Sequence, residues 1–230
     1  MISGEIMQDL SSYLEARIPT VYTVDSFPAE QPVFIADTNI LIDFVERRNK
    51  SVVNSLKLLI RSSKKEVLIL GTTIYNVAEF LDKMSCLVMM MRLLKKRYSP
   101  DYIIRTSNNK SQYARTIARE NIDEAQFKID VLKKIWMVFD NFAVFLPSFL
   151  DLKIVEEIKL LEKLVVDNFI QSQDAMILHL VSKINAISNF GAYFLTRDQY
   201  ILDVASSYAY TLDPSKSDEV QRVLKSIEVS

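Results

Sequence analysis

The 230-residue sequence has one cysteine, one histidine and three glycines, and each scarcity narrows what the protein can be. A single cysteine, Cys86, cannot form an internal disulfide or a thiolate zinc cluster, and it fits a reducing cytoplasm. A single histidine, His179, excludes a metal site built on several histidines, and a Ser-His-Asp triad would have to be built around it. The three glycines and six prolines predict a helix-rich chain with few tight turns.

Long apolar runs and a leader-like N-terminus are also absent. The longest apolar run, CLVMMM at residues 86–91, is far shorter than the roughly 20 residues of a membrane-spanning helix. The first ten residues lack the basic start and apolar core of a signal peptide. The composition, 49% hydrophobic and 25% charged, is that of a globular protein. We therefore expect a cytoplasmic protein with no membrane partner.

Strand-like and helix-like segments alternate along the chain, which predicts an α/β fold with a parallel sheet and right-handed crossovers. The expected strands are apolar throughout, which suits a sheet covered by helices on both faces, a three-layer α/β/α arrangement. Strands are expected at residues 32–36, 66–71, 192–196 and 209–212, with a short one at 21–24. Helices are expected near residues 5–16, 39–47, 51–62, 74–97, 111–145, 151–166, 172–187, 198–207 and 215–228, with residues 98–110 irregular.

Four acidic residues lie where two of these strands end or where helices begin. Asp37 directly follows the strand VFIA, and Asp198 comes two residues after the strand AYFLT. Glu79 lies two turns into the helix after the second strand, and Asp174 opens an apolar helix. Each acid alone could be a helix cap or a solvated helix residue. Together they predict a site, because ligands of parallel sheets bind beyond the carboxyl ends of the strands.

The segments around these acids, IADTNILIDF, TTIYNVAEF, SQDAMILHL and YFLTRDQYI, resemble the four sequence blocks of the PIN domain family, in that order. PIN domains are metal-dependent nucleases, many of which cleave RNA, and the VapC-type toxins are small examples. The resemblance covers about residues 32–82 and 150–213. It implies that Asp37, Glu79, Asp174 and Asp198 are the catalytic acids, and that the products carry 5′-phosphate and 3′-hydroxyl ends.

The chain departs from the small toxins at its start and in its middle. We divide it into an N-terminal extension, a PIN-like nuclease domain with a long helical insertion, and a C-terminal helix packed on the domain. These parts comprise residues 1–31, 32–213 with the insertion at about 84–149, and 214–230.

The acids imply a hard metal ion, because oxygen-only ligands suit Mg²⁺ or Mn²⁺ and not zinc. Such an ion removes the repulsion between carboxylates, binds a phosphate oxygen and lowers the pKa of a bound water. We expect Asp37, Asp174 and Asp198 to be the metal ligands, with Glu79 binding metal or orienting the attacking water. We also expect Asp37→Asn and Asp198→Asn to be tolerated by the fold, because neither acid should be needed for the core.

Polar neighbours of the acids are expected to support them. Thr38 and Thr196 place hydroxyl groups beside the acids, and Thr196 is the stronger candidate, while Asn39 is expected to cap or turn. Asp43 is six residues beyond Asp37 and is read as a solvated helix residue in preference to a second acid of the site.

Basic residues concentrate in the insertion. Residues 92–119 carry eight basic side chains against Asp101 alone, interleaved with tyrosines. Basic side chains pair with phosphates and aromatic rings stack on unpaired bases, so we expect this segment to grip RNA. The expected contacts are Lys95, Lys96, Arg97, Arg105 and Arg115.

The sequence therefore predicts a metal-dependent endoribonuclease with RNA as its substrate. Two other functions stay open: a non-catalytic PIN-like module that binds RNA or protein, and a structure-specific DNA nuclease. The apolar run in a long helix and the N-terminal extension suggest a homodimer. The resemblance to toxins adds an antitoxin-like protein partner.

Overall fold

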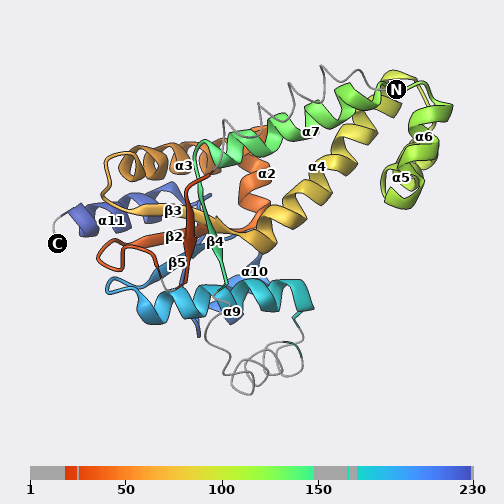
Figure 1. Cartoon of the computed structure of the whole chain (residues 1–230). Coiled ribbons are helices and arrows are strands. Elements are labelled where there is room, and N and C mark those ends of the chain that lie inside the picture. The colour runs from red at the N-terminus through yellow and green to blue at the C-terminus, as the bar shows by residue number, and fades with distance from the viewer. Residues whose placement is uncertain (1–18, 25, 148–164, 166–169, 229–230) are drawn as a thin grey trace. The chain divides into compact units, whose positions relative to one another are not determined.

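The computed structural model describes residues 19–24, 26–147, 165 and 170–228 (Figure 1). The described residues form two compact units, a sheet unit of residues 19–77 and 141–228 and a helical lobe of residues 78–140. The helices expected at residues 5–16 and 151–166 lie outside the described residues.

The sheet unit is built on six parallel strands in the order β1-β4-β3-β2-β5-β6. The central strand β2 reads VFIA and is wholly buried, as expected for a strand with a helix layer on each face. The strands are β1 Val21–Thr23, β2 Val33–Ala36, β3 Ile69–Thr73, β4 Ala143–Leu146, β5 Ala192–Leu195 and β6 Tyr210–Leu212. The predicted parallel α/β sheet is confirmed.

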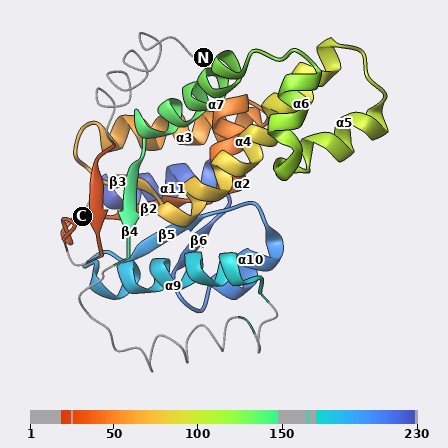
Figure 2. The same cartoon turned by 45° about the vertical axis from the view of Figure 1, so that its right-hand side comes forward.

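Helices cover both faces of this sheet (Figure 2). One layer consists of α2 (Thr38–Glu46), α3 (Lys50–Ser63) and α11 (Ser217–Glu228), and the opposite layer of α9 (Ser172–Ile187) and α10 (Gln199–Ala205). The predicted three-layer α/β/α arrangement is thereby confirmed.

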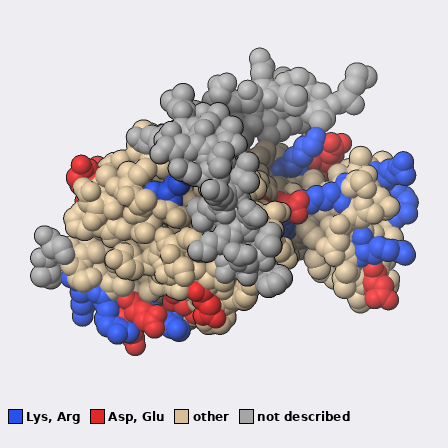
Figure 3. Space-filling model, turned by 90° about the horizontal axis from the view of Figure 1, so that it is seen from below, with Lys and Arg blue, Asp and Glu red and all other residues tan. Residues whose placement is uncertain are grey.

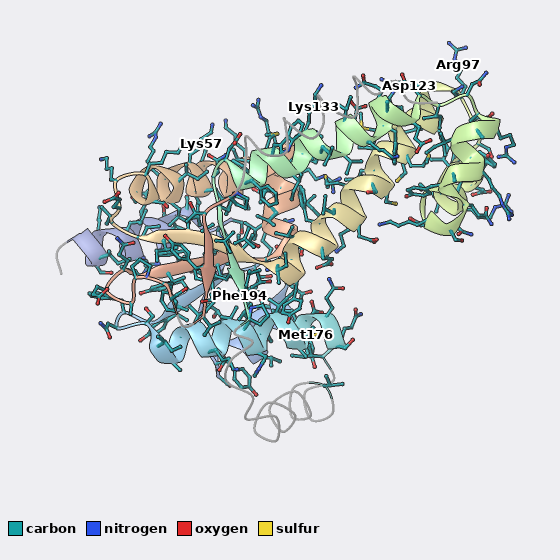
Figure 4. All side chains as sticks on the ribbon, in the orientation of Figure 1. Lys57, Arg97, Asp123, Lys133, Met176 and Phe194 are labelled. Carbon is teal, nitrogen blue, oxygen red and sulfur yellow. The ribbon has the colours of Figure 1, made fainter. Side chains whose placement is uncertain are left out.

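The spacing of apolar residues explains how helices α3 and α9 pack against the sheet. Val52, Leu56 and Leu59 of α3 recur at intervals of four and three, share one helix face and are fully buried. In α9, Ile177, Val181 and Ile184 do the same on the other side, within one core cluster that includes Ile35 of β2 and Phe194 of β5. In Figure 4 Phe194 lies between the strands and α9.

Strand β4 corrects the sequence-based expectation of one helical stretch over residues 111–145. Helix α7 (Glu124–Phe139) ends at Phe139, and Ala143–Leu146 then enters the sheet between β1 and β3. Pairing on both sides buries Val144 and Phe145, which a four-residue apolar run next to a helix does not reveal. The first strand, expected as a short element at 21–24, is β1 and pairs with β4.

Gly71 lets β3 pass close to this added strand. A Cβ at residue 71 would lie 2.6 Å from Cε2 of the Phe145 ring, so a larger residue would have to displace a buried aromatic side chain. Glycine is scarce, and four of the described residues adopt positive φ although they carry side chains, namely Arg47, Glu66, Arg97 and Asn121.

The lobe of residues 78–140 is helical. The insertion was expected at about residues 84–149, whose last part, Ala143–Leu146, instead belongs to the sheet. The helices of the lobe are α4 (Ile74–Lys95, in the lobe from Ala78), α5 (Pro100–Ser107), α6 (Tyr113–Arg119) and α7, with a 3₁₀ turn η1 at Lys110–Gln112. Residues 98–110 were expected to be irregular, which is wrong. Ser99 accepts the Tyr102 N–H, Pro100 opens α5, and both are start signals that the sequence shows.

The lobe has a core of its own, in which Val88 and Met89 of the CLVMMM run pack with Phe127 and Val131 of α7. Met91, from the same run, is 55% exposed. The ion pair of Arg92 with Asp130 also joins α4 to α7. Within the described part of the chain, no helix has the length and apolar character needed to cross a membrane.

Candidate active site

The sheet changes direction of winding between β2 and β5. From β2 the chain enters α2 in the α3 layer, whereas from β5 it enters α10, whose Ile201 and Ala205 pack in the core cluster of α9 (Figures 1 and 2). Ala36 of β2 pairs with Leu195 of β5, so both strands end side by side. A crevice between neighbouring strands whose connections leave to opposite faces is where α/β sheets place their ligands.

Asp37 lies at this point and accepts hydrogen bonds from both strand ends. It caps α2, with Oδ1 2.7 Å from the Thr38 N–H nitrogen. Its Oδ2 accepts from Asn39 Nδ2 at 2.6 Å and from Thr196 Oγ1 at 2.8 Å. Asp37 is only 9% exposed. The expectation that this residue is dispensable for the fold does not agree with these bonds, because a buried acceptor of several donors is costly to lose.

Asn39, Thr196 and Asp37 are hydrogen-bonded to one another, and we call these three residues the strand-end cluster. Asn39 Nδ2 also donates to Thr196 Oγ1 at 3.0 Å, and Asn39 Oδ1 accepts the Arg197 N–H at 3.4 Å. Thr196 is fully buried, and its hydroxyl oxygen accepts the Asp198 N–H at 3.2 Å. Asn39 therefore does not cap α2, whose cap is Asp37, and instead bonds the start of α2 to the connection that follows β5.

Asp198 is exposed and begins α10. Its Oδ1 accepts the N–H groups of Tyr200 and Ile201 at 3.0 and 3.2 Å, the geometry of a helix N-cap. Among the described residues, its Oδ2 has no hydrogen-bond donor. Asp198 is thus held through one carboxylate oxygen and through its own N–H, and the residue is exposed.

A second set of polar side chains, on β3 and α4, was missed by the sequence reasoning. Asn76 is fully buried, and its Nδ2 donates to the Ala36 carbonyl at 3.1 Å. Thr72 donates to the same carbonyl at 2.8 Å, and Thr38 Oγ1 lies 3.3 Å from Asn76 Oδ1. The signal was an asparagine within an apolar helical segment, where it is unfavourable without such partners.

Asp43 was expected to be solvated, which is wrong. Its side chain is 3% exposed, and its Oδ2 lies 2.8 Å from Nε of Arg197. This contact is an ion pair without hydrogen-bond geometry, so Oδ2 is buried with no hydrogen bond. Burial raises the pKa of the Asp43 carboxyl, against the opposing charges of Arg197 and Arg48. The pair ties the connection after β5 to α2.

The other two predicted acids, Asp174 and Glu79, lie in helices α9 and α4. Asp174 is half-buried in the first turn of α9, where a carboxylate favours the positive end of the helix. Glu79 belongs to the lobe and forms an i,i+4 ion pair with Lys83, with Oε1 and Nζ 2.6 Å apart. Hydrogen bonds connect Asp37 to Asp198 through Thr196.

The metal site stays a prediction. Over the described ranges, no three histidine, cysteine, aspartate or glutamate side chains gather into a group that could hold a metal ion. The donors that do lie at the strand ends are carboxylate, amide and hydroxyl oxygens, the kind that Mg²⁺ and Mn²⁺ take.

The five residues expected to contact RNA divide into two groups within the lobe. Lys95, Lys96 and Arg97 lie at the end of α4 and in the turn to α5, where Arg97 projects outward (Figure 4). Arg105 and Arg115 lie on α5 and α6 and line a pocket. Lys96 Nζ donates to the Glu120 carbonyl, so part of its role is internal to the lobe.

Comparisons of the chain with models of protein families, with curated proteins and with solved structures found no match of any of the three kinds. The resemblance to the PIN domain therefore rests on the four sequence blocks, and the functional interpretation on the geometry of the strand ends.

Proposed function

We propose that the chain is a metal-dependent nuclease that hydrolyses RNA phosphodiester bonds at the ends of β2 and β5. The observation that carries this proposal is the bonding of Asp37, through Thr196, to the connection that presents Asp198. Two carboxylates at adjacent strand ends, at the point where the winding reverses, are placed for a ligand that bears phosphate and metal. The resemblance of the four acidic blocks to PIN domains supports the same function.

Asp37, Asp174 and Asp198 would hold Mg²⁺ or Mn²⁺ in this proposal, and Glu79 would bind metal or orient the attacking water. Such an ion, when bound, would polarise the scissile phosphate and lower the pKa of a water molecule. Asn39 and Thr196 both donate to Oδ2 of Asp37 and so fix the rotation of its carboxylate. Asp198 would offer Oδ2, because its Oδ1 is engaged in capping α10.

A second candidate function is a PIN-like module that binds RNA or protein without cleaving it. It is favoured by the bonds at Asp37, since both carboxylate oxygens already accept hydrogen bonds from the protein. A third, a structure-specific DNA nuclease, would use the same acids, and no described side chain distinguishes the two sugars.

Further partners belong to the proposal as well. The exposed Met91 and Leu94 of α4, 55% and 56% accessible, support a homodimer, which light scattering at increasing concentration would test. An antitoxin-like protein is proposed on the resemblance alone. A cytoplasmic location is proposed because the free thiol of Cys86 suits a reducing compartment.

The test is a cleavage assay with labelled single-stranded RNA and a DNA of the same sequence, in EDTA, Mg²⁺ and Mn²⁺. We expect cleavage of RNA only with metal. Asp198→Asn should reduce the rate by roughly 100-fold or more, because even residues that only orient metal ligands cost about 10–100-fold. Asparagine caps helices as well as aspartate does, so α10 should stay intact.

Asp203→Asn is the matched control, because Asp203 is an exposed acid on the same helix. It should cleave at the wild-type rate. Binding of RNA without metal-dependent cleavage by the wild-type chain would instead support the non-catalytic module. Equal rates on DNA and RNA would favour the third function, and equal rates in Asp198→Asn and wild type would remove Asp198 from the site.

A further inference from the structure

The lobe contains a pocket of about 650 Å³ between α5, η1 and α6, remote in sequence from the four acidic blocks. Its volume lies within the range of roughly 300–1,000 Å³ typical of small-molecule sites. All of its lining residues belong to the lobe. They are Tyr102, Arg105, Thr106, Asn109, Gln112, Arg115, Thr116 and Arg119, and we call this the arginine pocket.

The charge of the arginine pocket is of one sign. Three arginines line it and no carboxylate does. Two other cations of the lobe have carboxylate partners, since Arg92 pairs with Asp130 and Lys110 with Asp82. Within the described residues, neither Arg105 nor Arg115 has an ion-pair partner. A cleft lined by cations alone concentrates positive potential and attracts anions.

The third arginine is held in place by a buried acid behind the pocket. Glu120 is 7% exposed, and its Oε1 lies 2.7 Å from Arg119 Nε. The same carboxylate accepts the hydroxyl groups of Tyr98 and Tyr102. The guanidinium carbon of Arg119 lies 5.3 Å from the centre of the Tyr102 ring. Arg119 is thus fixed through Nε and stacking, which leaves its two Nη groups available to a ligand.

Neutral donors complete the lining. Thr106 and Thr116 bring hydroxyl groups, and Asn109 and Gln112 bring side-chain amides. A guanidinium binds two phosphate oxygens at once, and hydroxyl and amide groups donate to further oxygens or to a base edge. The simpler explanation, arginines placed to favour the C-terminal ends of helices, fits Arg105 and Arg119 in last turns but not Arg115, which lies in the first turn of α6.

We propose that the arginine pocket binds the phosphate of a nucleotide unit, either in a single-stranded RNA or in a free nucleotide. This inference does not depend on the nuclease activity. It divides the five predicted RNA-contacting residues. Arg105 and Arg115 bind the phosphate directly, whereas Lys95 and Arg97 add to the surface charge and Lys96 bonds within the lobe. In Figure 3 the part of the surface formed by the lobe carries Lys and Arg side chains together with Asp and Glu side chains.

The test measures binding in EDTA, so that no cleavage takes place and its outcome is separate from that of the cleavage assay. The probes are a labelled single-stranded oligoadenylate, AMP and inorganic phosphate, the last two as competitors. The variant is Arg105→Gln with Arg115→Gln. The matched control is Lys128→Gln with Lys133→Gln, which removes the same charge from exposed positions on α7 of the same lobe, outside the pocket. Fluorescence of Trp136, the only tryptophan, verifies that the lobe is folded.

We expect the pocket variant to bind the oligonucleotide roughly 100-fold more weakly, because each hydrogen bond to a charged group is worth about tenfold or more. The slope of the logarithm of the binding constant against the logarithm of the salt concentration should decrease in magnitude by about 0.7 for each phosphate contact removed. The control should stay within about threefold of wild type, since surface charges act weakly. Competition by AMP identifies a nucleotide site, and binding of the strand alone identifies an RNA site. Equal losses in both variants, or no binding of any probe, would overturn the proposal.

Discussion

Asp37 in the sheet unit and Glu120 in the lobe are both buried carboxylates that hold several donors, but they connect very different lengths of chain. Asp37 and its donor Thr196 are 159 residues apart, whereas Glu120 and Tyr98 are 22 apart. Bringing distant residues together costs more chain entropy than closing a short loop. The strand-end cluster therefore forms only when the sheet is assembled, while the Glu120 cluster can form within the lobe itself.

The two regions also leave opposite charges exposed. At the strand ends an acid, Asp198, stays exposed after its neighbours have bonded to one another. In the lobe Arg105 and Arg115 stay exposed around a pocket. The proposed nuclease activity would require both a site that holds cations and a surface that holds phosphate, and Asp198 and the two arginines lie in different units.

The largest effect on stability is expected at Asp37. Asp37→Asn replaces one carboxylate oxygen by an amide nitrogen, so either the Thr38 N–H or the donors Asn39 and Thr196 lose an acceptor. A buried group left without its partner costs about 1–3 kcal/mol, which urea unfolding followed by circular dichroism would measure. Asp198→Asn is the control, and it should change the free energy of unfolding by only a few tenths of a kcal/mol, because asparagine still caps α10. Equal losses would show that Asp37 is no more structural than Asp198.

A smaller loss is expected at Glu120. Glu120→Gln keeps one acceptor oxygen but removes the charge that binds Arg119, and water can reach Tyr98, which is 36% exposed. We expect a loss of about 1 kcal/mol, at the low end for bonds to charged groups. Urea unfolding followed by Trp136 fluorescence would report it, because this residue lies in the lobe.

Glu124→Gln is the matched control for this measurement. Glu124 is an exposed acid in an i,i+4 pair with Lys128, and such pairs contribute only about 0.3–0.5 kcal/mol. If the two variants unfold alike, Glu120 does not organise the wall of the arginine pocket.

A small gain in stability over alanine is expected when glycine replaces a residue of positive φ, and each unit contains such a residue. Arg47, after α2, has φ 53°, and Arg97, after α4, has φ 61°. Glycine takes this conformation without the clash of Cβ, so Arg47→Gly and Arg97→Gly should each be more stable than the corresponding alanine variant by about 1 kcal/mol. Alanine removes the same charge and serves as the control. A higher melting temperature for an alanine variant than for the corresponding glycine variant would contradict the left-handed conformation at that residue.

The smallest effect is expected in the pH dependence of the sheet unit. Because burial raises the pKa of Asp43 above its ordinary 3.8, its contribution to stability is greatest at low pH and is lost as pH rises through the raised pKa. Asparagine does not titrate, so the stability of Asp43→Asn relative to wild type should increase from about pH 4 upward. Arg197, 38% exposed, can return to water in the variant. If the ion pair with Arg197 outweighed burial, urea unfolding at several pH values would instead show the stability of Asp43→Asn relative to wild type decreasing as pH rises.

Sequence reasoning succeeded where a local signal sufficed. The runs Val33–Ala36 and Ala192–Leu195 are apolar, begin after a proline or a glycine and end at a polar residue, so their strands were placed well. It failed at Ala143–Leu146, because four apolar residues after a helix carry no period that separates strand from helix. It also failed at Asp43 and Asn76, whose burial depends on partners in other elements.

The alternation of apolar strands and helices by itself determined the parallel three-layer fold, because parallel strands need crossovers and buried strands need cover on both faces. It also determined that Asp37 and Asp198 follow strands. Only the tertiary structure decided that β4 lies between β1 and β3, that Thr196 bonds to Asp37, and that Arg105 and Arg115 share one pocket. The physical reason is that sheet pairing, burial and pocket lining depend on which distant residues become neighbours, and a local pattern of residues carries no such information.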